Sequence, residues 1–422
     1  MYIFDLIFTE LLGINYEFID AIQDSHLNYS KNSGGKIHII PHGLLSQTDI
    51  RNDFKINFEN IDNQWFMFRT SNEGLLPFDV FSSAFYLVAR YEEYLPYEPD
   101  DHNRFTADFS CLIEHDLLLE PLVNQWALQI REILKKVDES LTFHSRKFEY
   151  LSTIDVDQAW KFKHKGGLRN VLGTFRDIKE GKWENFRDRW PVLFNLKKDP
   201  FYEAFQWHKT LETKFSLSPH YFILLGDYGK YDKNTPYDNS NFVKLIKSLD
   251  TGASVGIHPS YQSNDEEYRV AQEISRLTTM LERPIYTSRQ HFLMHSMPKT
   301  YRHLLQCGIQ EDYTMGYSTH LGFRAGIAAP FYWFDLENNV QSDLRLIPFC
   351  AMDITPLHYR GESPTEATKT IGELMDKVYA VNGLFISLWH NESFSETERW
   401  YGWRSVYEHM LAKAQALKNS VH

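Results

Sequence analysis

The sequence predicts an α/β fold, with a parallel sheet or (β/α) barrel in residues 148–422 and a smaller α+β domain in residues 1–147. Two observations predict it. From residue 148 onward, short apolar segments of strand character alternate with amphipathic segments of helical spacing, which is the pattern of parallel strands joined by helices. In addition, most of these apolar segments end in Asp, Arg or His, and a (β/α) barrel gathers its site residues at the carboxyl ends of its strands.

Length, composition and charge exclude several classes of protein. The 422 residues suit two domains, or one large barrel with an appendage. Hydrophobic residues make up 43% and charged residues 24%, so disordered and fibrous classes are excluded. The formal net charge of −12 argues against a general nucleic-acid binder and against peripheral adhesion to anionic membranes.

The cysteines and the start of the sequence predict a cytoplasmic location. Cys111, Cys307 and Cys350 lie far apart without a CxxC pair, which excludes a disulfide scaffold or a cysteine-rich zinc site. The first residues lack the basic region of a secretory signal. No run of about 18 apolar residues is present, so we expect no insertion into a membrane. The sequence leaves the oligomeric state open.

Residues 1–147 predict short strands followed by two helices. We expect a strand at 36–43, a hairpin at 54–69, a helix at 78–95 and a second helix at 120–137. Asp79 is placed to cap the first helix, and two lysines close the second, as suits the negative end of a helix dipole. Because this region carries no catalytic constellation, it is interpreted as a structural or partner-binding appendage.

Residues 148–422 predict the alternating part of the fold. The expected strands, each ending in polar residues, are 148–155, 220–227, 252–259, 283–291, 308–313, 344–353 and 383–391. The expected helices between them are 240–249, 267–281, 298–307 and 363–380. The last begins with a capping box formed by Ser363 and Glu366.

An insertion at about 161–214 interrupts this alternation. It holds 13 Lys or Arg against 7 Asp or Glu, with three interleaved tryptophans, Trp183, Trp190 and Trp207. One interpretation is an amphipathic helical insertion with a solvated basic face. The other is a lid over the strand ends that contacts an anionic or glycan substrate.

Asp155 and Asp157 form the first candidate site. Residues two apart on an extended strand face the same side, so the two carboxylates would share one space and repel each other. A metal resolves this conflict, with one carboxylate as ligand and the other as base toward a bound water. The same DxD pattern also occurs in nucleotide-sugar transferases, and as ordinary polarity at a strand end.

Four further residues follow predicted strands. His258, beside carboxylates, would complete a mixed N/O ligand set suited to Zn, Fe, Co or Ni. Arg289 could pair with an aspartate and hold it ionised, while His291, two residues on, could be another ligand. His390 could donate a proton to a leaving group. For each, a purely structural role is the alternative.

The order of these segments resembles a known family. The segments TIDVD, HYFILLGD, GIHPS, the strand with Arg289, GIQEDY and LWHN resemble the polysaccharide deacetylase superfamily (NodB homology, carbohydrate esterase family 4) over roughly residues 148–395. The stretches from Ser288 to Gly326 and from Pro77 to Pro96 are similar to a Bacteroidetes-type branch in which a domain of unknown function precedes the deacetylase-like domain.

The resemblance implies a distorted (β/α) barrel, a divalent metal that is usually zinc, and hydrolysis of N- or O-acetyl groups on a carbohydrate. By position, Asp155 corresponds to the family's base and Asp157 to a metal ligand. His258 corresponds to the first histidine of the metal motif, but Gln262 stands where the family has a second.

The remaining roles follow from the same resemblance. His291 is the candidate to replace the missing histidine ligand, Arg289 corresponds to the arginine that orients the base, and His390 corresponds to the general acid. Two other functions stay open: a catalytically altered, glycan-binding or scaffolding member of a polysaccharide assembly pathway, and a metal-independent barrel glycosidase with two carboxylates. The expected partner is a carbohydrate, with no nucleic acid.

Overall fold

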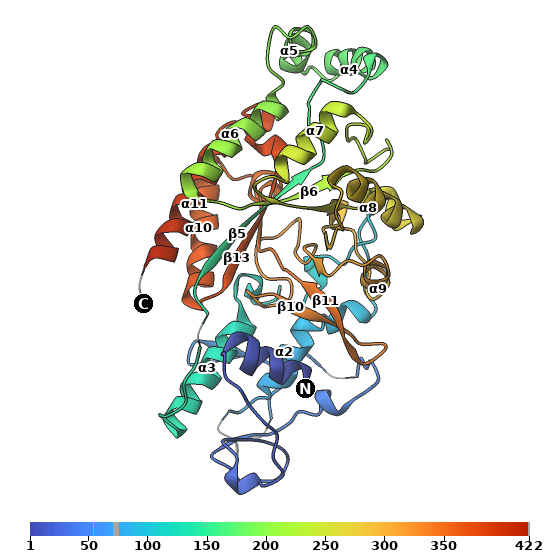
Figure 1. Ribbon diagram of the computed structural model, residues 1–422. Coiled ribbons are helices and arrows are strands. Elements are labelled where there is room, and N and C mark those ends of the chain that lie inside the picture. The colour runs from blue at the N-terminus through green and yellow to red at the C-terminus, as the bar shows by residue number, and fades with distance from the viewer. Residues whose placement is uncertain (54, 71–75, 145, 421–422) are drawn as a thin grey trace.

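A nine-stranded sheet forms the centre of the molecule. The computed structural model describes residues 1–53, 55–70, 76–144 and 146–420 (Figure 1). The strand order is β10-β11-β9-β8-β7-β6-β5-β13-β12, and every neighbouring pair in this sheet is parallel except β10 with β11, which is antiparallel. The strands are β5 (Glu149–Val156), β6 (His220–Leu224), β7 (Ser254–His258), β8 (Thr287–Ser288), β9 (Glu311–Asp312), β10 (Phe331–Asp335), β11 (Val340–Leu346), β12 (Ala351–Met352) and β13 (Leu384–His390).

The predicted α/β class with a largely parallel sheet is confirmed. Spatial order follows chain order from β5 to β9 and then β11, while β13 and β12 continue on the other side of β5. A barrel opened along one seam would have this order. Among the described residues the hydrogen-bonded ladder leaves β10 and β12 as edges. Closure into a distorted barrel therefore stays a prediction.

Helices connect the strands at the predicted places. They are α4 (Gly167–Lys179), α5 (Trp183–Leu193) and α6 (Pro200–Phe215) after β5, then α7 (Ser240–Leu249), α8 (Tyr268–Leu281), α9 (Lys299–Gln306), α10 (Pro364–Ala380) and α11 (Trp403–Asn419). The capping box of α10 is confirmed, because Ser363 Oγ accepts from the Glu366 backbone N–H and Glu366 accepts in return. In Figure 1, α4 and α5 project at one end of the molecule, whereas α6 lies against α11.

The N-terminal part contains the predicted hairpin and helices. Its elements are α1 (Tyr2–Phe4), the parallel pair β1 (Leu27–Tyr29) and β2 (Ile37–Ile39), the hairpin of β3 (Glu59–Ile61) and β4 (Gln64–Phe66), α2 (Val80–Val88) and α3 (Leu122–Val137). Asp79 caps α2 by accepting from the Ser82 backbone N–H, as predicted. Residue 54, at the start of the predicted hairpin, lies outside the described residues.

Two strand predictions differ from the structure. The segment 344–353 is not one strand: β11 ends at Leu346 and β12 begins at Ala351, and Pro348 between them has no N–H for a ladder. The segment 283–291 forms only the two-residue β8, so Arg289 and His291 follow the strand instead of lying on it. Strand β10, which pairs antiparallel with β11, was not predicted from the sequence.

The two parts of the chain share one hydrophobic core. A single cluster of buried residues runs from Ile3 through α2 and α3 to Ala414 in α11. At the junction, the buried carboxylate of Glu93 accepts from Arg90 Nε at 2.7 Å and from Arg324 Nη2 at 2.7 Å. All three side chains are at most 3% exposed. A buried carboxylate therefore joins a guanidinium from each part of the chain.

Replacing Glu93 with glutamine is expected to destabilise the whole chain. The change keeps the shape but leaves Arg324 without its carboxylate in a buried site, which typically costs about 3–5 kcal/mol. The midpoint of urea unfolding should fall when followed by circular dichroism. Asp376→Asn is the matched control, because the Asp376 carboxylate is 57% exposed and pairs with Lys413 at the surface. Equal midpoints for the two variants would contradict the assignment.

Candidate active site

The predicted site residues converge at the carboxyl edge of the sheet. In the parallel ladder, Asp155 of β5 lies opposite His390 of β13, and His258 closes β7 opposite Leu224 of β6. Close approach of β7 to β8 depends on Gly256, because a Cβ there would lie 2.3 Å from Thr287 Oγ1. After β8 the chain continues beside the end of β7, where the Arg289 N–H donates to the Ile257 carbonyl and the His291 N–H donates to the Pro259 carbonyl, and this brings Arg289 and His291 to the same edge.

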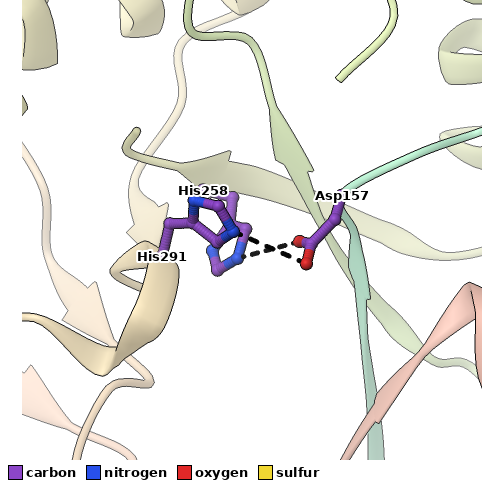
Figure 2. A group of neighbouring side chains, drawn as sticks. All are labelled: Asp157, His258 and His291. Atoms are coloured by element: carbon purple, nitrogen blue, oxygen red, sulfur yellow. Dashed lines mark ion pairs between the residues drawn. The ribbon is translucent and has the colours of Figure 1, made fainter. Parts of the chain in front are cut away.

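Asp157, His258 and His291 form a compact group (Figure 2). His258 Nε2 lies 3.3 Å from Asp157 Oδ1, and His291 Nε2 lies 3.5 Å from Asp157 Oδ2. One ligand atom from each of the three lies within 4.8 Å of the others. The sequence predicted these three residues as the metal ligands, and the fold brings them together.

The two imidazole rings are oriented by their other nitrogens. His258 Nδ1 lies 2.5 Å from the Arg289 carbonyl oxygen, and His291 Nδ1 lies 2.9 Å from Asp232 Oδ1. An N–H at each Nδ1 would donate to these oxygens and leave the lone pair of Nε2 directed at Asp157. This is the arrangement in which histidines bind metals, with the second nitrogen fixed by an oxygen acceptor.

The donor set fits a divalent cation. Asp157 Oδ1 is buried, and apart from the His258 ring nitrogen at 3.3 Å no side chain or backbone group in the described ranges is placed to pair with it. An unpaired buried carboxylate oxygen is costly unless a cation or donor compensates it. Two imidazole nitrogens and one carboxylate suit zinc and its neighbours in the first transition row. Ligands of one tetrahedral zinc lie about 3.5 Å apart, so only small side-chain movements would be needed.

Asp155 lies beside this group and is held by Arg289. Arg289 Nη1 donates to Asp155 Oδ1 at 2.9 Å, Nη2 donates to Thr153 Oγ1 at 2.7 Å, and Nε donates to the Tyr313 carbonyl at 3.0 Å. The second oxygen of Asp155 lies 3.6 Å from His258 Nε2. The Arg289 side chain is fully buried. Because Arg289 is buried, its hydrogen bond to Asp155 fixes the orientation of this carboxylate in a place that water does not reach.

His390 faces the group from β13 and is paired with Asp353. His390 Nδ1 lies 3.0 Å from Asp353 Oδ1, and the His390 backbone N–H donates to Asp353 Oδ2 at 2.7 Å. Its Nε2 lies 3.9 Å from Asp157 Oδ2. Burial favours the neutral ring, but the negative charges of Asp353, Asp157 and Asp155 outweigh it and raise the pKa of His390 to about 10.

Neighbouring charges also shift the pKa values of His291 and Asp157. Burial alone would lower the pKa of His291, but Asp157 and Asp232 raise it to about 9. Burial alone would raise the pKa of Asp157, but the neighbouring imidazoles, His291 foremost, hold it well below its usual range. Cation binding would therefore displace a proton from His291.

A cavity of about 220 Å³ opens onto these groups. Its polar end is formed by the carboxylates and histidines described above, and its walls are largely apolar, formed by Phe292, Leu293, Met352, Ile354, Leu388 and Trp400. Arg104 of the N-terminal part also lines the cavity and donates to the Phe292 carbonyl at 2.7 Å. A small apolar group would fit next to the ionisable residues.

All six predicted site residues meet here: Asp155, Asp157, His258, Arg289, His291 and His390. Gln262 does not, since its side chain lies 3.4 Å from the Asp227 carbonyl instead. Asp232 was not predicted from the sequence, because it lies in a loop with no strand or motif, and Asp353 was predicted only as the end of a strand. His295, His303, His320 and His358, which follow no predicted strand, lie outside the group.

Comparisons with known proteins give limited likenesses. A family of unknown function, DUF7033, matches residues 1–139. A search of curated proteins finds no match. Among solved structures, a Mycobacterium smegmatis protein assigned to the polysaccharide deacetylases is similar at 13% identity and a TM-score of 0.41, over 64% of this chain and 87% of that one. The polysaccharide deacetylase of Bacillus cereus is similar at 10% identity and a TM-score of 0.31, over 63% and 86%.

Proposed function

We propose that the protein is a metal-dependent hydrolase that removes acetyl groups from a carbohydrate. The observation that carries the proposal is the convergence of Asp157, His258 and His291 beside two supported groups: Asp155, held by Arg289, and His390, held by Asp353. A ligand set, a candidate base and a candidate acid thus surround one small cavity. The carbohydrate and the acetyl group come from the resemblance of the segments in residues 148–395.

Asp157, His258 and His291 would hold the metal. When bound there, a divalent cation supplies Lewis-acid polarisation of a carbonyl and lowers the pKa of a water. The protein keeps both imidazoles in the required tautomer through the Arg289 carbonyl and Asp232. Zinc is the expected metal because the ligand set combines imidazole with carboxylate.

Asp155 would take the proton from the attacking water. Its Oδ1 accepts a hydrogen bond from Arg289, and its Oδ2 faces the His258 side of the cavity. The attack of water on the acetyl carbonyl forms one C–O bond and releases one proton to this oxygen. Arg289 acts as a positioning residue because it contacts the base and, through its carbonyl, a ligand.

His390 would protonate the departing amine or alkoxide of the sugar. The ring nitrogen Nε2 faces the cavity, while Nδ1 is held by Asp353. The carboxylate of Asp353 favours the imidazolium form that a general acid needs. The C–N or C–O bond of the acetyl group breaks in this step, and acetate and the deacetylated sugar are the products.

Metal analysis and acetate release test the proposal together. We expect one divalent metal per purified chain, and release of acetate from acetylated chitin oligomers or acetylated xylan that a chelator abolishes and zinc restores. Stoichiometric metal without acetate release from any substrate would favour a glycan-binding member. Release of sugar without a metal would favour the glycosidase.

Replacing Asp232 with asparagine is expected to weaken metal binding about 10–100-fold, because it removes the charge that orients His291. The Asp232 carboxylate is fully buried and also accepts from the Tyr261 backbone N–H at 2.8 Å, a bond that an asparagine oxygen can keep. Competition with a fluorescent zinc chelator measures the change. Asp238→Asn in the same loop is the control, because Asp238 is exposed. Unchanged affinity in Asp232→Asn would remove Asp232 from the site.

A further inference from the structure

The hairpin of α4 and α5 exposes an apolar surface. On α4, Leu168, Val171, Leu172, Phe175 and Ile178 recur at helical spacing on one face, and Phe175 is 68% exposed. On α5 and the turn after it, Trp183, Phe186, Trp190, Phe194 and Leu196 are exposed as well, with Leu196 at 82%. We refer to these ten residues as the hairpin face. They belong to α4, α5 and the turn after α5, and these two helices project at one end of the molecule (Figure 1).

The hairpin of α4 and α5 buries polar side chains and exposes apolar ones, whereas an ordinary surface helix does the reverse. Its buried side is polar: Arg189 Nη2 donates to Asp177 Oδ2 at 2.5 Å, and Nη1 donates to Asn170 Oδ1 at 3.0 Å. These three side chains are nearly buried, while the apolar residues of the same helices point to solvent. The predicted helices are therefore present, but a basic face alone does not describe their exposed surface.

Exposed apolar side chains in this number indicate that another molecule covers them. Soluble monomers rarely expose a continuous apolar patch of this kind, and larger patches mark sites of association. The polar side of the hairpin is satisfied by internal ion pairs, so turning the helices over would bury charge instead of relieving the exposure. The apolar residues are thus presented outward by the fold itself.

The charges around the hairpin face indicate a membrane surface. Residues 161–198 carry 11 Lys or Arg against 4 Asp or Glu, in a chain whose net charge is −12. Exposed basic side chains border the face, among them Arg176, Lys179, Lys182, Arg187, Lys197 and Lys198. The last four also pair with Glu180, Asp188 or Glu203, so the excess of basic over acidic residues, and not each single side chain, gives the region its positive charge. Lysine is depleted at protein–protein interfaces, whereas basic residues beside Trp, Phe and Leu are the signature of helices that lie on anionic bilayers.

We propose that the α4–α5 hairpin docks on the surface of an anionic lipid bilayer. The apolar side chains of the hairpin face enter the boundary between headgroups and acyl chains, and the surrounding Lys and Arg side chains contact anionic headgroups. No helix in the described ranges is long and apolar enough to cross a membrane, so the contact would be peripheral. The net charge of −12 argued against adhesion to an anionic membrane. That value is a sum over the whole chain and does not reveal that basic residues are concentrated in residues 161–198.

A second cavity adjoins the hairpin and shares lining residues with the cavity of the candidate site. It measures about 1,040 Å³ and is lined by residues of α4 and α5, Leu172 and Trp183 of the hairpin face among them, and by basic residues that include Lys161, Lys165 and Arg169. Glu392, Arg399 and Trp400 line both this cavity and the smaller one that holds the site residues. A docked hairpin would therefore place the approach to the site beside the bilayer.

Vesicle sedimentation tests the proposal with the full-length protein. We expect the wild type to sediment with vesicles of phosphatidylcholine containing phosphatidylglycerol, and to bind vesicles of phosphatidylcholine alone less well. Leu172→Glu combined with Phe175→Glu should weaken partitioning by about 10–100-fold, because two apolar contacts are lost. Lys179→Gln combined with Lys198→Gln should reduce binding to the anionic vesicles only. Val340→Glu is the control, since Val340 is exposed on β11, away from the hairpin.

Two outcomes would overturn the proposal. In one, the wild type fails to bind anionic vesicles at low salt, or the Leu172/Phe175 variant binds as well as the wild type. In the other, the protein binds no vesicle but forms a dimer that the Leu172/Phe175 variant abolishes, in which case the face is an interface between copies. Because both residues are exposed, their substitution should leave the fold intact, as circular dichroism would verify. The assay requires no catalytic activity and is independent of the proposed hydrolysis.

Discussion

Replacing Asp157 with alanine is expected to abolish stoichiometric metal binding and to lower the turnover of an acetylated glycan by about 1,000-fold or more. Asp157 is the carboxylate that both histidine ligands face, at 3.3 and 3.5 Å. Its removal would leave two imidazoles without the carboxylate that faces both of them. Metal content measured by mass spectrometry and acetate release measured enzymatically report the two effects separately.

The control for this variant is Asp227→Ala. Asp227 also follows a strand of the sheet, but it is half exposed and its carboxylate pairs with Arg269 and Arg276 on α8. It should keep full metal content and activity. An Asp157→Ala protein that is folded and still carries one metal per chain would show that the ligand assignment is wrong. Loss of activity with retained metal would move Asp157 to the role of base.

Asp155→Asn and His390→Ala are each expected to lower turnover about 10²–10⁴-fold, as is usual when a positioned base or acid is removed. Both proteins should keep their metal, because neither residue is needed to complete the ligand set of Asp157, His258 and His291. This retained metal separates the acid–base residues from the ligands. Asparagine at 155 can still accept from Arg289, so the fold should persist.

His409→Ala is the matched control for the histidine variant. His409 lies on the exposed side of α11 and bonds to its own helix through the Ser405 carbonyl, so its loss should leave turnover unchanged. Wild-type turnover in both Asp155→Asn and His390→Ala would refute the proposed mechanism. If only His390→Ala kept its activity, the acid would have to come from another group at the cavity.

The sequence predicted the convergence of the site because parallel strands end at a common edge. Asp155, His258 and His390 each close a clear apolar segment, so their placement followed from strand order alone. The position of His291 was harder to predict, since β8 has only two residues and His291 lies beyond its end, where its backbone N–H donates to the Pro259 carbonyl. Asp232 gave no signal, because a loop carboxylate acquires its role only once His291 packs against it.

The orientation of the hairpin could not be predicted from helical spacing. Periodicity shows that α4 has an apolar face, but it does not show which face meets the body of the protein. That choice depends on the contacts among Asn170, Asp177 and Arg189, which join residues of two helices. The division of 344–353 into two strands could have been predicted from Pro348, because proline has no N–H to donate to a strand ladder.

Arg104 makes the N-terminal part a structural component of the cavity. Its guanidinium holds the main chain of Phe292, immediately after the candidate ligand His291. Because the buried core also runs through both parts of the chain, removing residues 1–139 would take away a support of the cavity together with part of the core. Residues 148–422 alone are therefore not expected to fold into a protein with an intact cavity.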